Sequence, residues 1–108
     1  MLAIYKSYNN ATEYAKDETP LFSGVATSYD ELYNRTFSPF AKWIFLNPPQ
    51  GETYQAKKQY LRNKAISVQA FTNNTPLSWG EIATITNYFT TYAKQYGLTT
   101  EFTENGII

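Results

Sequence analysis

The chain has 108 residues, of which 43% are apolar and 18% aromatic, a composition that predicts a single compact domain over residues 1–108 with a core built largely on rings. Nine basic and nine acidic residues balance to a formal net charge of zero, so no overall field draws the chain to nucleic acid or an anionic membrane, and no apolar run is long enough to cross a bilayer. Cysteine and histidine are both absent, which excludes disulfides, thiolate and imidazole catalysis and the usual zinc sites, so we expect no cofactor, no metal and a cytoplasmic location.

The N-terminal third predicts short elements. Residues 2–8 alternate in the manner of a strand. Asn10 with Glu13 forms a capping pattern that begins a helix over residues 11–17. Residues 21–27 then favour a second strand, which the glycine within them weakens.

A second capping box follows, and after it comes a segment that fits two structures. Ser28 and Glu31 form an S-x-x-E box that opens a helix over residues 29–35. Residues 39–46 fit either a helix or a buried strand, because Pro39 suits a first helical turn whereas residues 43–46 suit a buried strand equally well. The Pro- and Gly-containing stretch 47–51 is the clearest break in the chain, and we interpret it as a loop inside one domain.

Two long helices are predicted in the C-terminal half. The first covers residues 53–71 and carries an apolar stripe, although residues 66–71 taken alone also fit a strand. The second covers residues 79–96 and has a full set of boundary signals. Ser78 and Glu81 form its capping box, and Gly97 stands where a left-handed stop is needed.

Beyond this stop, residues 98–103 alternate like a strand. Together these elements predict an α+β fold in which the helices 53–71 and 79–96 pack as an antiparallel hairpin against a small sheet. An all-α domain is the alternative.

Acidic residues are the remaining candidates for catalysis. Glu13 and Asp17 stand four positions apart on a predicted helix, a spacing that places two carboxylates on one face. Such a pair can act as acid and base, but charged residues are mostly exposed and solvated. We therefore expect no enzyme.

A basic segment supports a nucleic-acid hypothesis. No acidic residue occurs between Glu52 and Glu81, whereas four cations cluster there, and tyrosines are interleaved with them. The candidate phosphate contacts are Lys57, Lys58, Arg62 and Lys64. On the helical wheel these cations flank the apolar stripe, where such side chains usually lay their stems on the core, so this is the alternative interpretation.

The second long helix carries an almost uncharged polar face, which favours a protein partner. Exposed helices usually carry Glu and Lys, whereas interface cores are depleted in charge. The candidate partner-binding residues are Thr84, Asn87, Thr91 and Lys94. With ten tyrosines available for contact, we expect a small non-enzymatic protein-binding module of the adaptor or inhibitor type, acting on another protein or on a second copy of itself.

Overall fold

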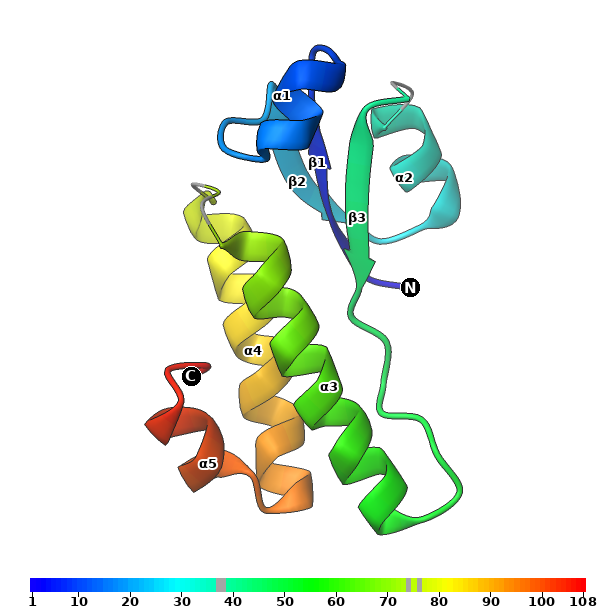
Figure 1. The fold of residues 1–108 in the computed structure, drawn as a ribbon. Helices are drawn as coiled ribbons and strands as arrows, with labels where there is room; N and C mark the ends of the chain where they lie inside the picture. The colour runs from blue at the N-terminus through cyan, green and yellow to red at the C-terminus, as the bar shows by residue number, and fades with distance from the viewer. Residues whose placement is uncertain (37–38, 74, 76) are drawn as a thin grey trace.

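The computed structural model describes residues 1–36, 39–73, 75 and 77–108. Its N-terminal half alternates strands with short helices: β1 (Ala3–Ser7), α1 (Ala11–Lys16), β2 (Phe22–Ala26), α2 (Tyr29–Arg35) and β3 (Ala41–Phe45). Its C-terminal half is helical: α3 (Tyr54–Thr72), α4 (Trp79–Tyr96) and α5 (Thr99–Glu104). The long helices α3 and α4 lie side by side as an antiparallel hairpin below the sheet (Figure 1).

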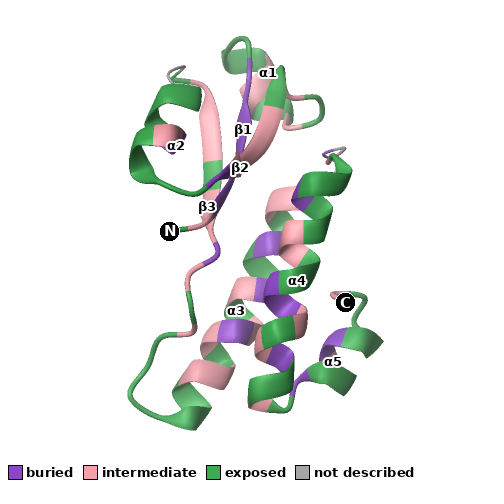
Figure 2. Cartoon of the chain, turned by 180° about the vertical axis from the view of Figure 1, so that it is seen from behind, coloured by how far each residue is buried: buried purple, intermediate pink, exposed green. Residues whose placement is uncertain are grey.

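The three strands form an antiparallel sheet in the order β2-β1-β3. The first strand is therefore central, and Ala3 pairs with Ala26 on one side and with Phe45 on the other. Every residue of β1 is buried, as the purple strand in Figure 2 shows, whereas both outer strands stay partly exposed. A strand buried along its whole length has to be covered on both faces of the sheet.

The two faces of β1 belong to two separate apolar clusters. Ile4 packs into the larger cluster with the helices of the hairpin and with α5. Ala3 and Tyr5, which point to the opposite face, pack in a smaller cluster with Leu32 of α2. The Tyr5 ring crosses Gly24 on this face, where a Cβ would lie 2.5 Å from the tyrosine hydroxyl.

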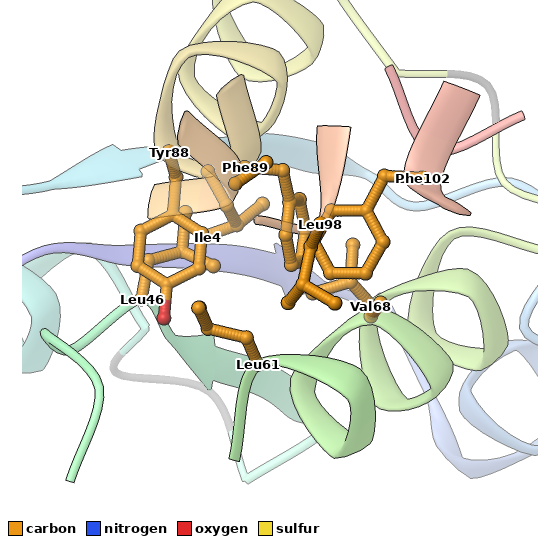
Figure 3. Packing of buried hydrophobic residues seen from close by; sticks show 10 residues of the cluster. Ile4, Leu46, Leu61, Val68, Tyr88, Phe89, Leu98 and Phe102 are labelled. Atoms are coloured by element: carbon orange, nitrogen blue, oxygen red, sulfur yellow. The ribbon is translucent and has the colours of Figure 1, made fainter. Parts of the chain in front are cut away.

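The larger core joins the hairpin, the sheet and the C-terminal helix. Figure 3 shows Phe89 of α4 facing Phe102 of α5, and their ring centroids are 5.6 Å apart at nearly right angles. Leu61 and Val68 of α3 complete the contact from below. The Tyr88 hydroxyl donates to the carbonyl of Asn47 at 2.6 Å, so this buried tyrosine ties α4 to the end of the sheet.

The predicted boundary signals of α4 are confirmed. The Glu81 carboxylate accepts from the backbone N–H of Ser78 at 2.7 Å, and Gly97 ends the helix with a left-handed φ of 66°. Glu81 is itself buried, and its second oxygen accepts from the hydroxyl of Ser23 at 2.7 Å. The cap therefore also fastens the start of α4 to β2.

The structure resolves the two open predictions and corrects a third. Residues 39–46 contain the strand β3, and residues 66–71 belong to α3. The strand predicted over 98–103 is wrong, because Leu98 follows the left-handed stop as the cap of α5. Phe102 lies four residues after Leu98, a spacing that fits alternate positions of a strand and also one turn of a helix. In the helix its ring packs against Phe89. The α+β prediction is confirmed and the all-α alternative is wrong.

Within the described part of the chain, no helix combines the length and the hydropathy that a bilayer span requires.

Candidate functional site

The predicted basic segment lies along α3, and its cations are partly buried. Arg62 forms a two-point ion pair with Glu101 of α5, with nitrogen–oxygen distances of 2.9 and 3.1 Å. This pairing raises the pKa of Arg62 and lowers the pKa of Glu101. The guanidinium thus joins α5 to the hairpin.

Two other cations of the segment lie against tyrosine rings of the same helix. The Nζ atom of Lys58 is 6.0 Å from the centre of the Tyr54 ring, and that of Lys64 is 5.5 Å from the centre of the Tyr60 ring. Burial also lowers the pKa of Lys64. These contacts agree with lysine stems that lie along the protein surface.

The predicted partner-binding residues of α4 lie partly on a groove. Thr84, Asn87 and Thr91 line a hollow of about 540 Å³ together with the N-terminus and the segment after β3. Lys94 lies outside that lining. The Thr84 hydroxyl donates to the carbonyl of Gly80 at 2.8 Å, so it serves its own helix.

A buried cation stands at the junction of sheet and hairpin. Lys6 is 0% exposed, and its Nζ donates to Asp17 at 2.7 Å, to the carbonyl of Phe71 at 2.6 Å and to the hydroxyl of Thr75 at 3.2 Å. An ammonium group has three donors, and each one here has an acceptor. Lys6 therefore links β1 to the loop after α1 and to the end of α3.

The carboxylate of Asp17 interacts with three side chains. Besides Lys6, the hydroxyl of Tyr8 donates to it, and the Nζ of Lys42 lies 3.5 Å from its second oxygen. Burial raises the pKa of Asp17, but the hydrogen bonds from Lys6 and Tyr8 outweigh it and hold the pKa below its usual value. Burial lowers the pKa of Lys6, and burial together with the carboxylate raises that of Tyr8. The charged groups of this cluster are thus paired with one another, and the cluster holds β1, β3 and the ends of α1 and α3 together.

The other face of the sheet is open where α2 meets β3. A groove of about 480 Å³ runs between them, lined by one face of α2 and by two side chains of β3. Its lining consists of Tyr29, Asp30, Leu32, Tyr33, Thr36, Trp43 and Phe45. We call this the α2–β3 groove.

Large aromatic side chains at this groove remain in contact with solvent. Tyr33 is 78% exposed and Trp43 is 50% exposed. Tyr29 and Phe45 also line the groove, and their ring centroids are 6.0 Å apart. Exposed aromatic side chains gathered in one hollow mark interaction sites on proteins.

The groove stays open because α2 is short and is anchored toward β2. This helix has two turns, and Arg35 in its last turn donates to the carbonyl of Val25 in β2 at 3.3 Å. Leu32 is its one buried residue, packed with β1. The part of the sheet face that belongs to β3 is therefore only partly covered by α2: Tyr29 lies near Phe45, whereas Trp43 stays half exposed.

The strand beside the groove also has an open edge. Leu46 donates to the carbonyl of Leu2, and Tyr8 donates to the carbonyl of Phe40, at 2.9 and 2.8 Å. In an antiparallel ladder these bonds alternate along the strand, so the backbone groups of residues 41, 43 and 45 point away from β1. Within the described part of the chain, no strand pairs with this edge.

This site was missed from the sequence, although a signal for it exists. Tyr29, Leu32 and Tyr33 fall on one face of a predicted two-turn helix, which is too short to bury that much aromatic surface. The segment 39–46 carries Trp43 and Phe45 on alternate positions, which becomes informative only if it is a strand.

The chain was compared with protein-family models, with curated proteins and with solved structures. None of the three comparisons gives a match.

Proposed function

We propose that this chain is a small non-enzymatic protein-binding module that binds a polypeptide at the α2–β3 groove and the adjoining edge of β3. The observation that carries the proposal is the coincidence of half-exposed Trp43 and exposed Tyr33 with an unpaired strand edge. Tryptophan and tyrosine dominate the energetics of protein interfaces.

The two features supply different parts of a binding energy. An added strand gains main-chain hydrogen bonds along the edge, independent of its sequence. Its alternate side chains then enter the groove, where the Trp43 and Phe45 side chains select apolar partners. Affinity and selectivity would thus come from one docking event.

The chemistry of the groove favours recognition over catalysis. Its lining is aromatic and aliphatic except for Asp30 and Thr36. The neighbouring carboxylate of Glu31 is paired with Arg35 at 3.0 Å and accepts from the backbone N–H of Thr27. The sequence offers neither imidazole nor thiol to complete a catalytic set.

A photo-cross-linking residue tests the proposal directly. Benzoylphenylalanine replaces Tyr33 at the rim of the groove, and in a matched variant it replaces Trp79, which is 86% exposed on α4. On irradiation in the cells that make the protein, we expect covalent adducts to a polypeptide from position 33, lost on adding Trp43→Ala. Equal adducts from both positions, or none from position 33, would contradict the proposal.

A further inference from the structure

We infer that the polypeptide bound at this surface is a second copy of this chain, whose β3 strand pairs antiparallel with the β3 strand of the first around a two-fold axis at Trp43. The inference rests on the proposed function, because it names the partner of the same surface. The observations that carry it are the open edge of β3 and the order of side chains along that strand.

The free backbone groups fix what kind of pairing is possible. Residues 41, 43 and 45 point their N–H and C=O groups outward, so these positions form the hydrogen-bonded pairs of a new ladder. With the axis at Trp43, the two Trp43 residues pair with each other and Ala41 pairs with Phe45. The two strands then overlap over the whole of Ala41–Phe45.

Side-chain sizes are complementary in this register. On the groove side the smallest residue of the strand, Ala41, lies opposite the large Phe45 of the other copy. The two Trp43 indoles, each of which lines the groove of its own copy, meet at the axis. Aromatic pairs of this kind stabilise neighbouring strands.

On the opposite face this register brings no like charges together. Lys42 is the one charged residue of the strand, and this register places it opposite Ile44 of the other copy. Its ammonium group is already held by Asp17 at 3.5 Å and lies 4.4 Å from the centre of the Tyr14 ring. Lysines often protect edge strands from pairing, but here the charge is turned back onto its own chain.

Neighbouring registers are less favourable. Moving the axis to Lys42 sets two lysines directly opposite each other, which is repulsive. Moving the axis to Ile44 pairs Ala41 with Asn47, beyond the end of the strand. Of these three registers, only the one centred on Trp43 pairs every residue of β3 with a β3 residue of the other copy without placing two lysines opposite each other.

Single-cysteine variants test the register, because the chain has no cysteine of its own. An equal mixture of Ala41→Cys and Phe45→Cys, which retains both Trp43 side chains, should form disulfide-linked dimers under mild oxidation. Paired residues lie about 5.5 Å apart, within reach of a disulfide. Either variant alone should not cross-link, since its two cysteines would lie about 14 Å apart along the strands.

Sedimentation velocity of the full chain tests the dimer itself. We expect a concentration-dependent dimer whose dissociation constant rises about tenfold or more in Trp43→Lys, because two like charges then meet at the axis. Trp79→Lys, with an equal change of charge on α4, should leave it unchanged.

Two results would overturn the inference. They are a wild-type chain that stays monomeric at the highest accessible concentration, and a dimer that Trp43→Lys leaves intact. A monomer that still gives adducts to another protein from position 33 would overturn the second-copy assignment alone. A monomer without such adducts would remove the proposed function as well.

Discussion

The two faces of β1 are covered in different ways. On the hairpin side Ile4 lies in the main core, and Lys6 is fully buried with all three of its donors satisfied. On the α2 side the cover is a two-turn helix with one buried residue, and Trp43 and Tyr33 remain in solvent. β1 is thus buried on both faces, but on the α2 side the neighbouring aromatic side chains of β3 and α2 stay in contact with solvent.

The two sides of the sheet therefore contribute to different properties of the protein, its stability and its association with a partner. Apolar surface buried on the hairpin side contributes to folding, whereas the aromatic surface on the α2 side is still available for association. A second contrast follows from the charges. On the hairpin side Lys6 and Arg62 are each paired with a carboxylate of the same chain, whereas the α2 side exposes aromatic rings.

The largest expected effect comes from truncating the main core. Phe89→Ala should lower the free energy of unfolding by about 3–5 kcal/mol, because it empties a fully buried site against Phe102. Trp43→Ala, which removes a larger ring from the other face, should cost the monomer less than about 1 kcal/mol. Urea unfolding of both variants measures the contrast, and similar losses would contradict it.

The buried ion pair should give the next largest effect. Asp17→Asn should cost about 3 kcal/mol, because Lys6 is left charged and buried without a carboxylate. The backbone at this position is left-handed, with a φ of 53°, and asparagine tolerates that conformation. Backbone strain therefore adds nothing to the loss of stability. The double variant Lys6→Met, Asp17→Asn should be more stable than Asp17→Asn alone. A double variant that is less stable would show that the pair is not the cause.

The same carboxylate predicts how stability depends on pH. The folded pKa of Asp17 lies below the unfolded value of about 3.9, so its contribution is present above that value and is lost as pH falls through the folded pKa. We expect the free energy of unfolding to fall on acidification below about pH 4, and to fall less steeply in Asp17→Asn. Urea titrations between neutral and strongly acidic pH measure the two slopes, and equal slopes would exclude Asp17 as a contributor.

The smallest effect on stability is expected at the rim of the groove. Tyr33→Ala removes a side chain that is 78% exposed, so it should change the free energy of unfolding by no more than about 0.5 kcal/mol. It should nevertheless weaken association, whereas Trp79→Ala should change neither quantity. Loss of stability without loss of association would reverse the assignment of this face.

The sequence predicted the elements whose ends have local causes. The boundaries of α4 follow from the Ser78–Glu81 box and Gly97, and the start of α2 follows from Ser28, whose side chain caps the helix as expected. The segment 98–103 was mistaken because alternation of Leu98 and Phe102 also fits a helix that turns back onto Phe89. Short apolar segments do not distinguish these structures without tertiary contacts.

The candidate site depends on an arrangement that no local pattern contains. The openness of the groove follows from Arg35 reaching across to β2 and from β3 standing at the edge of the sheet. Three of the four partner-binding residues predicted on α4, namely Thr84, Asn87 and Thr91, line a hollow, and none of the four lines the aromatic groove. Strand order decides which residues stand at an edge, and it is set by long-range contacts.

Fluorescence of Trp43 tests the central claim most directly. The chain has two tryptophans, so in Trp79→Phe the only indole is the one at the open edge. The account predicts that acrylamide quenches Trp43 less strongly as the protein concentration rises, while in Trp43→Phe the quenching of Trp79 stays constant. A Trp43 that remains equally accessible at all concentrations, or a Trp79 that becomes shielded instead, would contradict it.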